Sequence, residues 1–284
     1  MTLWQNITDK MLHTRSKLFL LIGINVVVYL AINVPATFEF LFLKHDYIGY
    51  YTHEYLQLPS NLKKLAQHFW TPLTYMFMHG NVLHILFNMA WLYWMGQIFE
   101  EFLGTKRTIG LYIFGGLAGA LFFVACFNLI PVFVGSDMNV VGASAGVMAI
   151  VIATATLMPN YTINLLLIGP VKLKWFALVY VLIDFLSTRE ANAGGSIAHL
   201  GGALLGFIYI KRLQSGSDWI GGINKMFTPK PKMKVVSKNP EKNTPSKPQQ
   251  EEIDRILDKI SQTGYDNLTR QEKEVLFRAS KDEG

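Results

Sequence analysis

The stretch HGNVLHILFNMAWLYWMGQIF, residues 79–99, decides the fold of this 284-residue chain. It contains no Lys, Arg, Asp or Glu, and about 20 predominantly apolar residues are enough to cross a bilayer as a helix. Five further apolar stretches occur along the chain, at 18–36, 108–130, 142–158, 174–187 and 196–213. Two of them, 142–158 and 174–187, are short, which suits interior helices of a bundle. The pattern predicts an all-α membrane protein, a bundle of six transmembrane helices.

The distribution of charge indicates a membrane protein with a polar extension. Only 16% of residues are charged and 51% are hydrophobic, whereas about a quarter are charged in ordinary soluble domains. Residues 211–284 hold 26 of the 46 charges. The net charge of +6 does not indicate nucleic-acid binding, because the basic residues flank apolar stretches instead of gathering on an aromatic-bearing domain. The single Cys126 excludes a disulfide framework and a cysteine-based zinc site.

Loop charge sets the predicted orientation in the membrane. Lys and Arg gather before the first span, between the second and third, before the fifth and after the sixth, and the opposite short loops are poor in them. Both termini are therefore predicted to be cytoplasmic. The predicted organisation has four parts: a cytoplasmic N-terminus at 1–17, a six-helix core at 18–213, a flexible linker at 214–250 rich in Pro, Lys, Asn, Gln and Ser, and a C-terminal segment at 251–284.

The C-terminal segment is predicted to be a small cytoplasmic helical hairpin. Apolar residues recur in its first half at helical spacing, at Ile253, Ile256, Leu257 and Ile260. Thr269 and Glu272 form a capping-box signature before a second apolar run. Nothing in this segment has the pattern of a catalytic site.

Polar residues inside spans are costly and are candidates for chemistry; here they are His84, Asn88, Ser144 and His199. Each alone could simply pack, bonded to a helix carbonyl or to a neighbouring helix. However, His84 and Asn88 are four residues apart and share one helix face. The second, fourth and sixth spans all start from the non-cytoplasmic side, and the two histidines and Ser144 lie within about two turns, roughly 10 Å, of those starts. The four residues are predicted to meet at one depth, near water.

Two local glycine patterns add to this picture. The stretch Gly142-Ala143-Ser144-Ala145-Gly146 fits the G-x-S-x-G pattern of a nucleophile elbow, but without a preceding strand it does not indicate an α/β-hydrolase. What is left is a serine at a helix N-terminus, where free N–H groups favour developing negative charge. Small-residue pairs four apart predict close helix contacts; they are Gly115 with Gly119, Gly142 with Gly146, and Gly202 with Gly206.

Three ordered motifs resemble those of the rhomboid intramembrane serine proteases. They are H-x4-H-x3-N at 79–88, G-x-S at 142–144 and A-H-x-x-G-x3-G at 198–206, and the resemblance covers about residues 15–213. It implies hydrolysis of a peptide bond in or beside a transmembrane segment of a membrane-protein substrate, through a dyad of Ser144 and His199. His199 would take the proton of the Ser144 hydroxyl.

The oxyanion formed on the substrate would be met by the Ser144 backbone N–H and by the side chains of His84 and Asn88. The resemblance implies no cofactor, and the chain has no H-E-x-x-H motif that would indicate a metal-dependent protease. It implies partners in the lipid bilayer and a place in a bacterial inner membrane. The hairpin resembles a C-terminal extension of rhomboids from Bacteroidetes-type bacteria. The oligomeric state and the physiological substrate stay open.

The chain departs from the family pattern in two places, and two rival functions stay open. Ala145 follows the serine where many rhomboids have Gly, and Met148 stands where some have an aromatic residue. One rival is a proteolytically inactive relative that binds membrane clients, against which the intact serine and histidine argue. The other is a transporter with a polar path through His84, Asn88 and Asp184, although no inverted repeat is visible.

Three further expectations concern the surroundings of the site. His79 is predicted to be structural, at the junction of loop and helix. Substrate access is predicted to be lateral, with the fifth span and the 188–195 loop as the movable part, freed by Gly194 and Gly195. The order Ser144, Asp184, His199 resembles the Ser…Asp…His order of an α/β-hydrolase triad. Asp184 is nevertheless predicted to act through loop stability, where it could pair with Arg189, so that its amide variant loses less than tenfold in activity.

Overall fold

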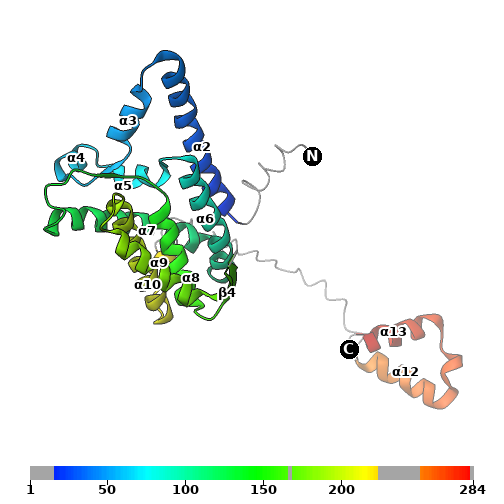
Figure 1. Cartoon of the computed structure of the whole chain (residues 1–284). Helices are drawn as coiled ribbons and strands as arrows, with labels where there is room; N and C mark the ends of the chain where they lie inside the picture. Colours follow the sequence, from blue (N-terminus) through cyan, green and yellow to red (C-terminus); the bar gives the residue numbers. More distant parts are fainter. Residues whose placement is uncertain (1–15, 166–167, 223–249, 282–284) are drawn as a thin grey trace. The chain divides into compact units, whose positions relative to one another are not determined.

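Helices occupy all six predicted apolar stretches of the chain (Figure 1). The computed structural model describes residues 16–165, 168–222 and 250–281, and its contacts divide the chain into two units, Met1–Pro229 and Lys230–Gly284. The helices at the predicted spans are α2 (Leu18–Phe38), α6 (Val82–Leu103), α7 (Thr105–Leu129), α8 (Ser144–Leu157), α9 (Leu173–Ser187) and α10 (Ala193–Gln214).

Four helical segments are long and apolar enough to cross a membrane: Leu18–Leu43, Val82–Leu103, Thr105–Leu129 and Ala193–Gln214. The first of them is α2 continued by a π-helical turn, η1 (Glu39–Leu43). The predicted class, an all-helical membrane protein, is confirmed. Helices α8 and α9 have only 14 and 15 residues, so the count of six spans stays a prediction.

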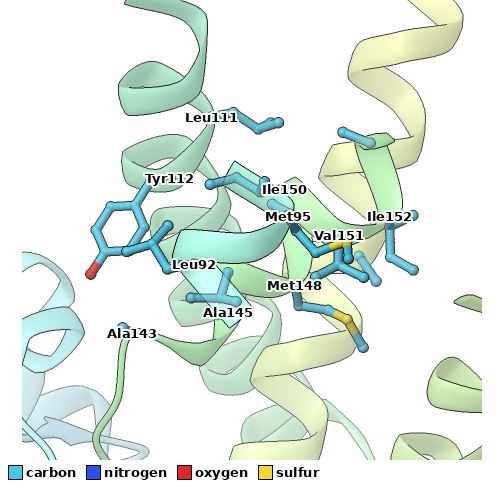
Figure 2. Packing of buried hydrophobic residues seen from close by; sticks show 14 of the residues in the cluster. Leu92, Met95, Leu111, Tyr112, Ala143, Ala145, Met148, Ile150, Val151 and Ile152 are labelled. Carbon is cyan, nitrogen blue, oxygen red and sulfur yellow. The ribbon is translucent and has the colours of Figure 1, made fainter. Parts of the chain in front are cut away.

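Helix α8 is the core of the first unit. All eleven residues from Ala145 to Ala155 are buried, which is the behaviour of a helix that is apolar on every face. Side chains of α6 and α7 gather around it; Figure 2 shows Ala145, Met148, Ile150, Val151 and Ile152 of α8 with Leu92 and Met95 of α6 and Leu111 and Tyr112 of α7. A central helix covered by its neighbours can be shorter than one that faces lipid along its whole length.

Glycines let α7 and α10 approach α8 closely. A methyl group on Gly115 of α7 would stand 2.4 Å from the Ala149 Cβ, and one on Gly119 would stand 2.5 Å from the Ala145 Cβ. On the other side, a methyl group on Gly202 of α10 would lie 2.0 Å from the Ala145 carbonyl oxygen. A methyl group on Gly206 would likewise lie 2.3 Å from the Ala149 carbonyl oxygen, and one on Gly146 would lie 2.5 Å from the Tyr112 carbonyl oxygen. The predicted close helix contacts are confirmed for these five glycines of the three pairs. Their contacts fix the position of the first turn of α8.

Short elements connect the long helices on the side where α6, α8 and α10 begin. They are α3 (Tyr47–Tyr55), β1 (Leu58–Pro59), α4 (Leu62–Gln67), α5 (Thr71–Thr74), the 3₁₀ turn η2 (Tyr75–Phe77) and β2 (Asn139–Val140). Strands β1 and β2 pair antiparallel, with Leu58 opposite Val140. Between α8 and α9, β3 (Thr162–Leu165) and β4 (Gly169–Lys172) also pair antiparallel.

The segment after α10 corrects the predicted start of the linker. Residues 217–222 were expected to be part of a flexible linker at 214–250, but Asp218 accepts hydrogen bonds from the Arg107 guanidinium at 2.7 and 2.9 Å. The Trp219 ring packs edge-on against Tyr209 of α10, and Ile220 is fully buried. A buried apolar anchor and an ion pair therefore hold this segment on the core. The rest of the predicted linker, 223–249, lies outside the described residues, as do residues 1–15 of the N-terminus.

The second unit contains two helices, α12 (Gln250–Thr263) and α13 (Arg270–Lys281), joined by a 3₁₀ turn, η3 (Tyr265–Asn267). The predicted capping box is confirmed: Glu272 Oε2 accepts from the Thr269 backbone N–H at 2.7 Å, and the Glu272 N–H donates to the Thr269 hydroxyl oxygen at 3.4 Å. Lys259 of α12 donates to Glu272 of α13 at 2.9 Å. These contacts, with buried Ile256 and Leu268, hold the two helices together.

Candidate active site

The first turn of α6 presents His84 in a defined orientation. Asn81 is the N-cap residue of this helix, and its side-chain oxygen accepts from the His84 backbone N–H at 2.8 Å. The Gly80 N–H donates to His84 Nδ1 at 3.4 Å. Since Nδ1 accepts this bond, the proton of the neutral ring is on Nε2. His84 therefore offers an N–H donor from Nε2.

Asn88 lies one turn further along α6. Its Nδ2 donates one hydrogen bond to the His84 carbonyl oxygen at 2.9 Å. An amide nitrogen carries two protons, so the second N–H of Asn88 is left for another acceptor. His84 and Asn88 thus supply two N–H donors from successive turns of one helix.

The turn before α8 places Ser144 beside His84. Gly142 has a φ of +131°, a backbone conformation that residues other than glycine rarely adopt. A Cβ on Gly142 would stand 2.8 Å from His84 Nε2 and 3.2 Å from Ser144 Oγ, so both atoms lie against the Gly142 backbone. The Gly142 N–H donates to the Tyr75 carbonyl oxygen at 2.9 Å, which holds the turn in place. Ser144 is the first residue of α8, where the backbone N–H groups have no partner within the helix.

His199 lies in the second turn of α10, and its ring contacts α9. His199 Nδ1 is 2.9 Å from Asp184 Oδ1. This contact overturns the expectation that Asp184 pairs with Arg189 in the loop. A carboxylate oxygen can only accept, so Nδ1 of His199 carries the proton and Nε2 presents a lone pair. The ring is in the form that a general base requires.

One cavity of about 560 Å³ brings the four predicted residues together. His84 and Asn88 come from α6, Ser144 from α8 and His199 from α10. The other lining residues are Asn81, Phe87, Trp91, Asn139, Val140, Val141, Val147, Tyr180, Asn192 and Gly195. The cavity thus contains a hydroxyl, an imidazole with a free lone pair and N–H donors within one space.

Among the described residues, no hydrogen bond joins Ser144 Oγ to His199. In proteins without substrate such bonds are often long or misaligned and form when substrate binds. Among the same residues, no group of three or more His, Cys, Asp or Glu side chains could hold a metal ion. The residues that line the cavity offer a nucleophile, a base and hydrogen-bond donors.

The surroundings of the site bear on two further expectations. His79 is buried in the loop before α6, and its ring centroid is 5.2 Å from that of His84; its structural role stays a prediction. Gly194 and Gly195 do not loosen a loop, because both lie in the first turn of α10. A Cβ on Gly194 would stand 2.7 Å from Val140. The absence of a side chain at Gly194 allows α10 to pack against β2, so this glycine permits close packing and does not make the loop flexible.

The sequence interpretation considered Asp184 as the acid of a triad and set it aside, but the structure places its carboxylate against His199. The buried residues of α9 are Leu173, Ala177 and Asp184, which fall on one stripe of a helix with 3.6 residues per turn. This stripe turns Asp184 towards the bundle, but it does not stand out in the sequence, because most other residues of α9 are apolar as well. Tyr180 belongs to the same stripe and also lines the cavity.

Comparisons with known proteins agree with the geometry. Residues 66–215 match the model of the rhomboid domain. Residues 241–282 match a family of unknown function, DUF6576. The chain is 29% identical over 161 residues to the rhomboid protease GlpG of Yersinia pseudotuberculosis, which is 54% of this chain and 51% of that protein. It is also 29% identical over 157 residues to RHOMBOID-like protein 12, mitochondrial, of Arabidopsis thaliana, covering 51% of this chain and 47% of the relative. The chain spans about half the length of these relatives.

Proposed function

The chain belongs to the rhomboid family, whose domain covers residues 66–215, and from this premise we propose that it is an intramembrane serine protease acting through Ser144 and His199. The observation that carries the proposal is the single cavity lined by Ser144, His199, His84 and Asn88. The names of the two relatives include a rhomboid protease, which supports the same reaction class.

In the first step, Ser144 Oγ attacks the carbonyl carbon of the scissile peptide bond while His199 Nε2 takes the hydroxyl proton. The carbonyl π bond opens, and its electrons become negative charge on the oxygen. The neutral tautomer of His199, with its proton on Nδ1 facing Asp184 at 2.9 Å, is the one able to accept at Nε2.

The oxyanion is stabilised by donors from two helices. His84 Nε2–H lies against the Gly142 backbone beside Ser144 Oγ, and Asn88 has one amide N–H left after its bond to the His84 carbonyl. The Ser144 N–H at the start of α8 is the third donor. Loss of one such donor costs about 10²–10³ in rate in well-studied hydrolases.

Collapse of the tetrahedral intermediate breaks the C–N bond, and the His199 imidazolium gives its proton to the departing amine. A water molecule then attacks the ester on Ser144, passing a proton to His199, and the second collapse returns that proton to Ser144 Oγ and releases a carboxylic acid. Water reaches this site because the cavity is polar and lies at the ends of the helices where α6, α8 and α10 begin.

The chain is an integral, multi-pass membrane protein, and finer statements of its setting belong to the proposal. We place it in a bacterial inner membrane with both termini in the cytoplasm, as the loop charges favour. Its substrates are transmembrane segments of other proteins. They reach the cavity between α6 and α9, where the Trp91 ring stacks on Phe176 with centroids 4.9 Å apart.

The test is cleavage of a fluorescently tagged single-span membrane protein by the full-length chain in detergent micelles. Ser144→Ala and His199→Ala should each abolish turnover in protein that remains folded. Ser217→Ala, an exposed serine outside the cavity, is the matched control and should cleave like the wild type. Turnover near that of the wild type in folded Ser144→Ala or His199→Ala would refute the proposal and favour one of the rival functions.

A further inference from the structure

Asp184 is a buried carboxylate in a helix that exposes most of its large apolar side chains. It is 5% exposed, and α9 exposes seven of its large apolar side chains: Trp175, Leu178, Val179, Leu182, Ile183, Phe185 and Leu186. An ionisable group inside a membrane helix is costly and is kept where it has a partner or a function. The position of Asp184 on the inward stripe therefore calls for a specific partner.

The partner is the His199 imidazole. Asp184 Oδ1 is 2.9 Å from His199 Nδ1, and Asp184 Oδ2 is buried without a hydrogen-bond partner among the described residues. On the elements packed against α9, α8 contributes no ionisable side chain, and α10 contributes His199 near this level. The other titratable group on the inward stripe of α9 is Tyr180, one turn earlier. Among the described residues, the group within hydrogen-bond distance of Asp184 that can become a cation is the His199 imidazole, once it is protonated.

We propose that Asp184 is a positioning residue that orients the His199 ring and stabilises its protonated form during cleavage. The inference rests on the proposed function, since it concerns the same site. Asp184 extends the Ser144 and His199 pair to three residues contributed by three different helices. The carboxylate holds the Nδ1 proton, so the lone pair of Nε2 stays available to take the proton of the Ser144 hydroxyl.

The proton balance is simple. When Ser144 Oγ loses its proton to Nε2, the imidazole becomes a cation beside the Asp184 carboxylate, and the pair is then oppositely charged. Asp184 itself stays ionised and takes no proton, as in the serine protease triads, where the acid holds the tautomer and stabilises the imidazolium. When Nε2 returns the proton to the leaving amine, the histidine is neutral again.

The same contact could instead serve only to tie α9 to α10. The two roles differ in what a substitution changes. A tie between helices affects folding stability and leaves the chemistry of folded molecules intact. A positioning carboxylate affects kcat while KM and the melting temperature change little, and a longer carboxylate at the same place restores part of the loss.

The experiment compares Asp184→Asn, Asp184→Glu and the matched control Asp218→Asn in the full-length protein in micelles. Asp218 pairs with Arg107 at 2.7 Å and is outside the cavity, so its variant reports the loss of a purely structural carboxylate pair. The readouts are kcat and KM for the tagged single-span substrate, the rate of Ser144 labelling by a fluorophosphonate probe, and the melting temperature.

Asp184→Asn should lower kcat by about 10²–10⁴, with KM within threefold of the wild type, because the amide no longer enforces the tautomer. Its labelling rate should fall in parallel. Asp184→Glu should recover at least tenfold relative to Asp184→Asn. Asp218→Asn should keep kcat within threefold while its melting temperature falls.

The outcomes separate the two proposals. A wild-type protein that is folded but neither labelled nor active contradicts the proposed function itself. A labelled, active wild type with a folded Asp184→Asn variant whose kcat is within tenfold overturns the role of Asp184 alone. If Asp184→Asn does not fold, Asp184→Ser takes its place under the same criterion; failure of both to fold, or a loss in Asp184→Glu equal to that in Asp184→Asn, also overturns the positioning role.

Discussion

Replacing Gly202 with alanine would place a methyl group inside the contact between α8 and α10. The new Cβ would stand 2.0 Å from the Ala145 carbonyl oxygen, whereas ordinary van der Waals contact begins at 3.4 Å. The obstacle is backbone and cannot rotate away, so the helices must separate by about 1.4 Å along that line. Gly202 is one turn after His199, and Ala145 follows Ser144 directly, so the separation falls on the two reacting residues.

The expected loss follows from this displacement. Misplacing a catalytic group by 1 Å costs on the order of 10² in rate, so Gly202→Ala should lower kcat by about 10² or more. Overpacking a tight contact costs about 1–3 kcal/mol of stability, so the melting temperature should fall as well. In Gly206→Ala the new Cβ would stand 2.3 Å from the Ala149 carbonyl oxygen, one helical turn further from the reacting residues. It should destabilise the fold to a similar degree with a smaller loss of kcat.

The assay is cleavage of the single-span substrate and thermal unfolding of the full-length protein in the same micelles. Gly222→Ala is the control, because a Cβ there meets nothing within 4 Å, and it should match the wild type in both measurements. If Gly202→Ala retained the kcat and melting temperature of the wild type, the helix contact would not position the site, and this reasoning would be refuted.

Two further predictions concern the oxyanion donor and the hairpin. Asn88→Ala should slow cleavage by about 10- to 10³-fold while Ser144 still reacts with a fluorophosphonate, because it removes a donor and leaves the nucleophile intact; an unchanged rate would return Asn88 to a packing role. The hydrogen bond from the Thr269 N–H, with those from Lys259 and the Thr269 hydroxyl, lowers the pKa of Glu272 from 4.5 to about 2. Its carboxylate therefore stabilises the hairpin above about pH 4.5, and this contribution is lost as the pH falls towards 2. Methyl NMR signals of Ile256 should report loosening over that range, and Glu272→Gln should abolish the pH dependence; a dependence identical to the wild type would contradict it.

The residues of α6, α8 and α10 could be predicted from sequence because each carries its own local signal. His84 and Asn88 share a helix face by their spacing, Ser144 opens a helix after a glycine, and His199 precedes glycines at i+3 and i+7. These signals depend only on helix geometry and on the cost of polar groups in lipid. They required no knowledge of which helices are neighbours.

Asp184 could not be placed by the same reasoning because its partner is on another helix. Arg189 is near in sequence, but it lies in the turn beyond the end of α9 at Ser187. The stripe with Leu173 and Ala177 turns Asp184 inward instead. That stripe predicts burial and cannot by itself identify the side chain that faces it.

Contacts between residues far apart in the sequence also explain why Asp218 and Gly194 differ from the expectations drawn from the sequence. Asp218 pairs with Arg107, 111 residues earlier in the chain, so the composition of the surrounding segment did not reveal that it is held on the core. Gly194 was expected to give freedom, but its role depends on Val140 lying 2.7 Å from where its side chain would be. A glycine that loosens a loop and one that permits close packing look alike in sequence.

The most direct test of the central claim is to map the residue that a fluorophosphonate probe modifies in the full-length wild-type protein by mass spectrometry. We expect one adduct, on Ser144, that is lost in His199→Ala, because the hydroxyl reacts only when the His199 imidazole takes its proton. An adduct on another serine, or none at all on the folded wild-type protein, would contradict it.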